Sequence, residues 1–146
     1  MNDLAMIMEK LKNSGLKNTK HRLELMKLLH TSAVPLSADS LYAKMKKTDI
    51  LISLSTVYRA LETLIEKDLV SKIQLDSESK ALYEFNRQTH HHFLVCIGCN
   101  KIFTLKDCPI HEHDFDSEEH HGFQIIGHKL ELYGYCEECQ KKIASS

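Results

Sequence analysis

Apolar residues in the first third of the chain recur every three or four positions, the spacing of one face of an amphipathic helix. The pattern predicts a helix over residues 3–14 that ends at Gly15, because glycine readily adopts the left-handed conformation that closes helices. Thr19 and Ser37 are expected to cap a second and a third helix, since a hydroxyl oxygen can accept a hydrogen bond from a free backbone N–H. The positions predicted on the apolar faces are Leu4, Ile7, Met8, Leu11, Leu25, Leu28, Leu29, Leu41, Tyr42 and Met45.

The segment "SLSTVYRALETLIEKD" continues the helical spacing, and a strand pattern follows it. Ser55 is the expected N-cap of this fourth helix, whose apolar stripe is Val57, Leu61, Leu64 and Ile65. The β-prone runs "LVSKIQL" and "KALYEF" are joined by the polar turn 76–79, which predicts a hairpin. Helices followed by a hairpin are typical of a winged helix-turn-helix, in which the last helix before the hairpin enters the major groove of DNA.

Polar side chains at the start of the fourth helix are candidates for reading DNA bases. Arg59 can donate two parallel hydrogen bonds to guanine, and Tyr58 can contact a thymine methyl group or a phosphate. Basic residues near the second helix can neutralise phosphates. The candidate DNA-binding residues are Lys17, Thr19, Lys20, Arg22, Ser55, Thr56, Tyr58 and Arg59. On the pattern alone, a helical scaffold with solvated charges explains the region equally well.

The net charge of −1 over 146 residues hides a difference between the two parts of the chain. Residues 1–82 carry 13 Lys and Arg against 10 Asp and Glu, whereas residues 83–146 carry 6 against 10. Eight of the ten histidines and all five cysteines lie in the second part. No apolar run approaches the roughly 18 residues that span a bilayer, and the N-terminus lacks the features of a secretory signal. We therefore expect a soluble, cytoplasmic protein with reduced thiols.

The cysteines form two C-x-x-C pairs separated by 36 residues, and one is left over. Each pair follows β-rich sequence, and four thiolates in a tetrahedron are the usual closed structural zinc site. The long spacer requires a small sheet to bring the pairs together. Cys96, Cys99, Cys136 and Cys139 are therefore predicted to bind structural Zn²⁺. Cys108, with no partner at C-x-x-C spacing, is expected to be a buried free thiol.

The run "THHHFLVC" is strand-like, and side chains on a strand point alternately to opposite faces. His90 and His92 would share one face while His91 points to the other, so the triplet could serve two sites. His128 lies on another predicted strand. The segment "CPIHEHDFDSEEHHG" is expected to form a polar, solvated helix that starts at Pro109, which leaves no assigned role for His113, His120 and His121.

Three stretches, "STVYRALETLIEKDLV", "HHHFLVCIGCNKIFTLKDCPI" and "GFQIIGHKLELYGYCEEC", together resemble the ferric uptake regulator family of bacterial metal-sensing repressors. The details "DCPI" and "GHKLELYG" are most similar to the zinc uptake regulators of that family. The resemblance implies an α+β fold: a winged helix-turn-helix DNA-binding domain (residues 1–82), a hinge (83–88) and a C-terminal α/β dimerisation domain (89–146) with the four-cysteine zinc site. It also implies a homodimer that binds a palindromic, AT-rich double-stranded operator, with a tetramer on DNA as the open alternative.

The resemblance further implies a regulatory metal site in the dimerisation domain. His90, His92 and His128 match its ligands. His111 stands at the position of the fourth ligand, which is usually Glu, and Glu112 is adjacent to it.

A second site at the hinge would involve Glu84 and His91, which match positions used in iron-type members. Phe93 and Pro35 stand where those members usually offer histidines. Asn86 stands roughly where zinc-type members often use a cysteine. The sequence therefore leaves three alternatives for the hinge site: it is absent, it is degenerate, or another ligand, such as one from the His-rich helix, completes it.

The sequence thus predicts a zinc-responsive repressor of metal uptake genes, with Zn²⁺ as the structural and the regulatory ion. The nitrogen-rich donor set favours Zn²⁺, and Fe²⁺ or Mn²⁺ is the alternative regulatory ion, as in the iron, manganese or peroxide sensors of the family. A zinc hydrolase or deaminase is disfavoured, because a deaminase needs H-x-E followed by P-C-x-x-C. A structural zinc protein with idle histidines is a further alternative. We expect no enzymatic activity, no membrane partner and no small organic substrate.

Overall fold

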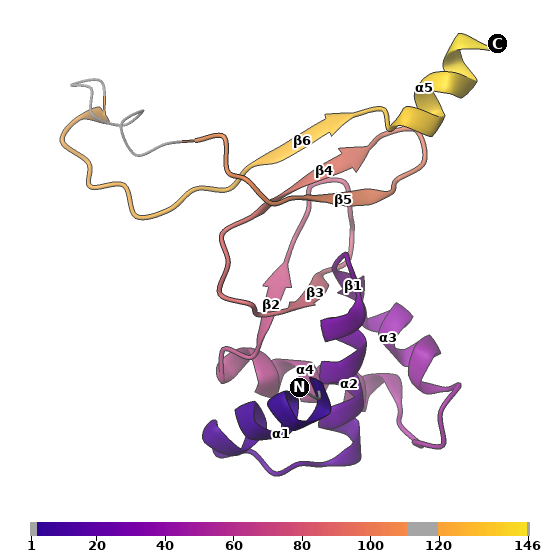
Figure 1. Ribbon diagram of the computed structural model, residues 1–146, viewed down its shortest axis with the longest axis vertical. Coiled ribbons are helices and arrows are strands. Elements are labelled where there is room, and N and C mark those ends of the chain that lie inside the picture. Colours follow the sequence, from indigo (N-terminus) through magenta and orange to yellow (C-terminus); the bar gives the residue numbers. More distant parts are fainter. Residues whose placement is uncertain (1–2, 111–119, 146) are drawn as a thin grey trace. The chain divides into compact units, whose positions relative to one another are not determined.

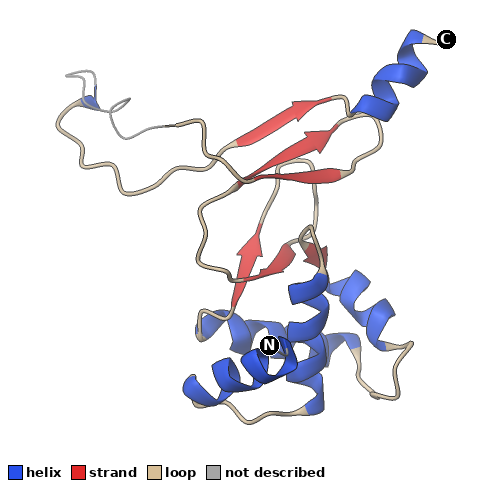
Figure 2. Ribbon diagram, in the orientation of Figure 1, coloured by secondary structure: helices blue, strands red, loops and turns tan. Residues whose placement is uncertain are grey.

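The structure is a computed structural model that describes residues 3–110 and 120–145 of the chain. The chain divides into two compact units, Met1–Gln88 and Thr89–Ser146, called here the N-terminal and the C-terminal unit (Figure 1). Helices dominate the first and strands the second (Figure 2). Within the described ranges, no helix has the length and apolar character that a membrane crossing requires.

Helices of the N-terminal unit pack around one hydrophobic core. They are α1 (Asp3–Asn13), α2 (Lys20–Thr31), α3 (Ala38–Met45) and α4 (Leu54–Glu66). Each contributes a fully buried leucine, namely Leu11, Leu25, Leu41 and Leu61. The predicted helices are therefore confirmed, and one predicted core residue is wrong. Met8 is 39% exposed, because the stripe that α1 buries runs through Ile7 and Leu11.

Hydroxyl groups cap the N-terminal ends of three helices. Thr19 Oγ1 accepts a hydrogen bond from the Arg22 N–H at 3.2 Å, and Ser37 Oγ accepts one from the Ser40 N–H at 3.1 Å, as predicted. The predicted cap of α4 is wrong.

Ser53, and not Ser55, caps α4 by accepting from the Thr56 N–H at 3.2 Å. Leu54 packs against the core and so draws the first turn two residues earlier, leaving Ser55 inside it.

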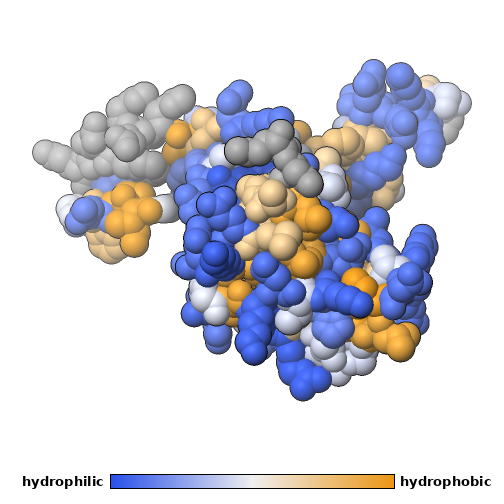
Figure 3. Space-filling model, turned by 60° about the horizontal axis from the view of Figure 1, so that its bottom comes forward, coloured by the Kyte–Doolittle hydropathy of each residue, from blue (hydrophilic) through white to orange (hydrophobic). Residues whose placement is uncertain are grey.

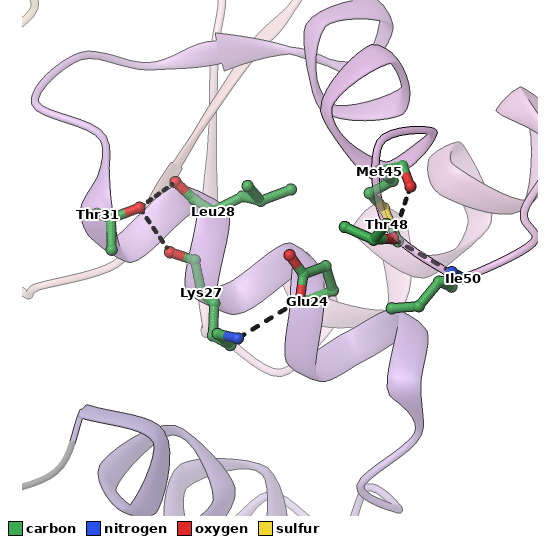
Figure 4. A network of polar contacts seen from close by, with 7 residues as sticks. All are labelled: Glu24, Lys27, Leu28, Thr31, Met45, Thr48 and Ile50. Carbon is green, nitrogen blue, oxygen red and sulfur yellow. Dashed lines mark hydrogen bonds and ion pairs between the residues drawn. The ribbon is translucent and has the colours of Figure 1, made fainter.

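Hydrogen bonds also satisfy carbonyl groups at the C-terminal ends of α1, α2 and α3. Gly15, with a φ of +84°, follows α1, and its N–H donates to the Lys12 carbonyl at 3.0 Å. Figure 4 shows two threonines whose hydroxyl groups donate to carbonyl groups at the C-terminal ends of α2 and α3. Thr31 Oγ1 donates to the Lys27 carbonyl at 3.0 Å, and Thr48 Oγ1 donates to the Met45 carbonyl at 2.6 Å. Carbonyl groups that lack a partner at a helix end are thereby satisfied.

A small antiparallel sheet completes the N-terminal unit. Strands β1 (Leu36–Ser37), β2 (Val70–Ile73) and β3 (Leu82–Phe85) lie in the order β1-β3-β2. The hairpin β2–β3 pairs Val70 with Phe85 and Ile73 with Leu82, which confirms the predicted wing and the winged helix-turn-helix.

The predicted hinge, residues 83–88, begins inside β3. Tyr83, Glu84 and Phe85 are paired in that strand, and the connection to the C-terminal unit starts at Asn86. Arg87 holds this connection against α2, because its guanidinium donates to the His30 carbonyl at 2.5 Å.

The C-terminal unit is built on a second sheet and a terminal helix, α5 (Glu137–Ala144). The central strand β4 (His92–Cys96) runs antiparallel to β5 (Ile102–Leu105) and parallel to β6 (Glu131–Gly134). Phe93 and Val95 are buried, whereas Leu94 is 36% exposed.

Three histidines predicted to lie on strands are outside them in this unit. His90 and His91 precede β4, because β5 ends at Leu105, directly opposite His92, and offers them no partner. His128 lies three residues before β6, since the pairing with β4 starts at Glu131.

Candidate metal centres and DNA-binding surface

The four predicted zinc-binding cysteines converge at one end of the C-terminal sheet and are called here the cysteine cluster. Cys96 is the last residue of β4, and Cys99 lies in the turn that follows. Cys136 is the N-cap of α5, and Cys139 lies in its first turn. The sulfur atoms all lie within 4.8 Å of one another, and those of Cys99 and Cys136 are 3.8 Å apart. A zinc tetrahedron with Zn–S bonds of about 2.3 Å has S–S edges of about 3.8 Å, so the geometry fits Zn²⁺.

Gly98 makes the close approach of the two cysteine pairs feasible. A Cβ atom at this position would lie 2.9 Å from the Cys139 sulfur. Any side chain between Cys96 and Cys99 at position 98 would therefore push α5 away from the turn.

Hydrogen bonds lower the pKa of the Cys96 thiol to about 6, chiefly because the Cys136 backbone N–H donates to its sulfur at 3.2 Å. The pKa of Cys139 is raised to about 12, first because its thiol shares a hydrogen bond with Cys96 and then because it is buried. Four thiols this close cannot all ionise alone, since like charges repel. A divalent cation would compensate the charge and hold all four as thiolates.

A second group of donor atoms, the histidine cluster, comprises His90, His92, Cys108 and His128. The Nε2 atom of His90 lies 3.0 Å from that of His92 and 3.1 Å from that of His128. The Nε2 atoms of His92 and His128 are 3.0 Å apart. All three imidazoles therefore point the same nitrogen at one spot.

Hydrogen bonding alone cannot account for this triangle of nitrogens. In a neutral imidazole, Nε2 either donates or accepts, and it cannot do both. Three mutually close Nε2 atoms must therefore include at least one donor–donor or acceptor–acceptor contact. A cation at the centre, bound by three lone pairs, satisfies all of them. Burial, and then the neighbouring His90 and His128, lower the pKa of His92, so this imidazole is kept neutral and its lone pair is available to a metal.

Cys108 is the member of this cluster that the sequence did not reveal. The predicted free thiol is half-buried, with its sulfur 3.3 Å from His92 Nε2 and 3.2 Å from His128 Nε2. The signal that could have found it is the strand register. Since β5 ends at Leu105 opposite His92, a residue three positions further along can turn back to that histidine. The predicted fourth ligand, His111, and the adjacent Glu112 lie outside the described residues, as does His113.

The two predicted hinge ligands belong to neither cluster in the described ranges. Glu84 is paired with Ser71 in the wing. His91 is not a member of the histidine cluster, and its ring lies 5.3 Å from that of Phe93 while its Nδ1 lies 3.3 Å from the Thr89 carbonyl oxygen. The predicted separation of His91 from His90 and His92 is therefore what the structure has. His120 and His121 lie in neither cluster.

The predicted DNA-binding residues lie at the N-terminal ends of α2 and α4. Tyr58 is 38% exposed, and Ser55 and Arg59 are also exposed, whereas Thr56 is half-buried. An Arg59 nitrogen donates to Thr56 Oγ1 at 3.4 Å, which orients the guanidinium along the helix. A contact of 3.3 Å between His21 Nε2 and the Leu51 carbonyl places the start of α2 beside the segment that precedes α4.

The predicted DNA-binding residues around the start of α2 differ in their exposure to solvent. Lys17, Thr19 and Lys20 are exposed, whereas Arg22 is half-buried and donates to the Lys17 carbonyl at 3.2 Å. Arg22 thus fixes the turn before α2 with part of its guanidinium. On the face shown in Figure 3, hydrophilic residues alternate with separate apolar areas.

The sequence profile of the Ferric uptake regulator family matches residues 13–133. The chain belongs to the ferric uptake regulator family. The ferric uptake regulation protein of Campylobacter upsaliensis is 38% identical over 136 residues, covering 90% of this chain and 85% of that protein. The ferric uptake regulator of Helicobacter pylori superposes with a TM-score of 0.78 at 29% identity, covering 95% of each chain. The regulator of Vibrio cholerae does so with a TM-score of 0.72 at 31% identity, covering 88% of this chain and 98% of that one.

Membership of the ferric uptake regulator family confirms the predicted resemblance and the α+β fold. The protein is a metal-responsive transcription regulator of a family whose members bind DNA operators as dimers and are not enzymes. The relatives just described are named for iron, whereas the sequence pattern favoured zinc. Iron is therefore the better supported metal.

Proposed function

We propose that this protein represses metal uptake genes as a homodimer, and that a metal ion in the histidine cluster sets its affinity for a palindromic operator. The observation that carries the proposal is the convergence of three Nε2 atoms, each 3.0–3.1 Å from the others, in the C-terminal unit of a family member. Ferrous iron is the first candidate for the regulatory ion. The Helicobacter pylori relative, 30% identical, is a ferric uptake regulation protein, and the Francisella tularensis regulator, 28% identical with a TM-score of 0.74, was solved with iron.

The position of the cluster suggests how an ion would act. His90 lies two residues after Gln88, the last residue of the N-terminal unit, and His128 lies 38 residues further along the chain. An ion held by both would fix the first residues of the C-terminal unit, from which the connection to the winged helix departs. The ion favours the DNA-binding arrangement only as far as it binds that arrangement more tightly than the others.

Operator recognition is assigned to the exposed N-terminal turn of α4 and to the basic residues at the start of α2. In a dimer, two copies of α4 would enter successive major grooves of a palindromic site. Arg59 is proposed to read a base, while Lys17 and Lys20 are proposed to contact phosphates. Glu84 and His91 are kept as a proposed additional hinge site, and the cysteine cluster is proposed to hold a structural Zn²⁺ ion.

Zinc is the second candidate for the regulatory ion, because the described members of the histidine cluster include no carboxylate. Hard ions such as Mn²⁺ prefer oxygen donors, whereas imidazole suits zinc as well as iron. The sequence-based prediction of zinc therefore stays a prediction that the donor set supports.

The proposal is tested by DNA binding during metal titration. Protein that retains only the zinc of the cysteine cluster is titrated with anaerobic Fe²⁺, with Mn²⁺ and with Zn²⁺, and binding to the DNA upstream of its own gene is followed by fluorescence anisotropy. A rise in affinity of about 10–100-fold with one ion, lost in His90→Ala, supports the proposal and names the ion. Operator affinity that no ion changes would refute it.

A further inference from the structure

Cys108 occupies the place of a fourth ligand in the histidine cluster. Its sulfur lies 3.3 Å from His92 Nε2 and 3.2 Å from His128 Nε2, and all four donor atoms lie within 4.8 Å of one another. A tetrahedral zinc ion with Zn–N bonds of about 2.0–2.1 Å and a Zn–S bond of about 2.3 Å has N–N edges of about 3.3–3.4 Å and N–S edges of about 3.5–3.6 Å. The observed separations are close to these values.

The surroundings of the Cys108 sulfur argue against a purely structural thiol. A structural buried cysteine behaves as a small apolar side chain and packs among others. The Cys108 sulfur instead faces two imidazole nitrogens and the Ile110 carbonyl, the last at 3.5 Å. The residue is also placed by the fold, because the antiparallel register sets Leu105, the last residue of β5, opposite His92.

We propose that Cys108 is a thiolate ligand, and that the histidine cluster is a closed, four-coordinate metal site of three imidazoles and one thiolate. Binding replaces the thiol proton, which leaves to solvent, with a sulfur–metal bond, while the three neutral imidazoles each give a lone pair. Four protein ligands leave no position for water, in contrast to an open catalytic site. The predicted ligand His111 is not needed for this coordination.

A thiolate has a consequence for metal choice. Sulfur donors favour Zn²⁺ and its spectroscopic substitute Co²⁺ over Mn²⁺, whereas a carboxylate in the same place would favour the harder ions. The chain would thus bind zinc more tightly than a variant with a carboxylate at position 108. This consequence for regulation rests on the proposed function, but the ligation itself does not.

Cobalt spectroscopy tests the ligation directly. Full-length protein with one zinc ion retained in the cysteine cluster is titrated with one equivalent of Co²⁺, and the zinc content is measured again afterwards to exclude exchange. We expect intense visible bands typical of tetrahedral cobalt and a thiolate-to-cobalt charge-transfer band in the near ultraviolet. Cys108→Ser should lose the charge-transfer band and bind Co²⁺ and Zn²⁺ at least about 10-fold more weakly, since even the loss of an outer-shell partner costs that much. Cys108→Asp should bind Mn²⁺ more tightly, relative to Zn²⁺, than Cys108→Ser does.

The matched control is His121→Asn, because His121 is exposed and belongs to neither cluster. It should keep the full spectrum. Wild-type protein that binds Co²⁺ without a charge-transfer band, or a Cys108→Ser variant that keeps the band, would overturn the proposal. If the variants fail to fold, alkylation of the wild-type protein tests whether Cys108 is a ligand. Iodoacetamide should modify Cys108 before metal is added to the histidine cluster and not afterwards, and unprotected Cys108 would refute ligation.

Operator binding is measured on the same samples, so that the two proposals can fail separately. A charge-transfer band together with metal-independent operator affinity would refute the proposed function and leave the thiolate-ligated site standing. Metal-dependent operator binding without the band would refute the thiolate ligand and leave the proposed function standing.

Discussion

The Nε2 atoms of His90 and His128 lie 3.1 Å apart, although 38 residues separate them along the chain. In the absence of an ion, these two nitrogens gain at most one weak hydrogen bond, so the contact does little for the stability of the fold. The arrangement is instead suited to metal binding, because the lone pairs of both nitrogens are directed to the same place.

Replacing His128 with Ala should therefore weaken regulatory metal binding at least about 10–100-fold. Unfolding of the metal-free protein should change little, since the half-buried ring has no apolar core around it. Isothermal titration calorimetry measures the first effect and thermal denaturation the second. Wild-type metal affinity in His128→Ala would show that the assigned ligand is wrong.

Ser53→Ala should destabilise the N-terminal unit by about 1 kcal/mol, because the Thr56 N–H loses its capping partner. Ser55→Ala is the matched control, since Ser55 lies inside the first turn of α4 and should change stability by less than about 0.5 kcal/mol. Urea denaturation of both variants measures the difference. Equal losses, or a larger loss at Ser55, would contradict the start of α4 at Leu54.

Leu61→Ala should destabilise the N-terminal unit by about 2–5 kcal/mol, because Leu61 is fully buried and the substitution leaves a cavity in the core. Leu51 offers the contrasting position. It is 94% exposed, and Leu51→Ala should stay within about 0.5 kcal/mol of the wild type. Both free energies of unfolding come from denaturant titrations that follow the helical circular dichroism.

Removal of zinc from the cysteine cluster should unfold the end of the C-terminal unit while the N-terminal unit stays folded. Structural zinc sites contribute roughly 10–16 kcal/mol of apparent binding free energy at neutral pH, whereas the core around Leu25 and Leu61 belongs wholly to the N-terminal unit. Hydrogen exchange before and after chelation should show protection lost in β4, β6 and α5 and kept in α2 and α4. Global loss of protection in both units would contradict this independence.

Arg59→Ala should weaken operator binding by about 1–3 kcal/mol and relax the sequence preference at one base pair. Lys20→Ala should instead weaken binding to all sequences and lower the salt dependence of log K by about one unit. Lys142→Ala, in the exposed last turn of α5, serves as the charge control. If Arg59→Ala and Lys142→Ala bind alike, the assignment of α4 as the reading helix is wrong.

Local patterns predicted the N-terminal unit well. Helix spacing, the caps at Thr19 and Ser37 and the hairpin each depend on residues within a few positions of one another. Ser55 was misassigned because two serines two positions apart satisfy the same capping rule. Only the packing of Leu54 against the core decides between them.

The histidine cluster includes contacts between distant segments, which such local patterns do not predict. The sequence correctly separated His91 from the cluster, although His90 and His91 precede β4 and strand alternation does not place them. It could not bring in Cys108, which joins the site through the pairing of β5 with β4. Contacts of this kind depend on the register between paired strands, which is set by the pattern of buried residues and by turn geometry, and not by the residue types of the ligands themselves.

Strand β4 begins with His92 of the histidine cluster and ends with Cys96 of the cysteine cluster. Its two ends lie about 13 Å apart at the usual rise of a strand, and both residues are buried. An ion on Cys96 would immobilise one end of β4 and would lower the entropy that His92 loses when a second ion binds, which would couple the two sites. Such coupling would be reciprocal, and the metal concentration at which the regulator responds would shift with the occupancy of its cysteine cluster.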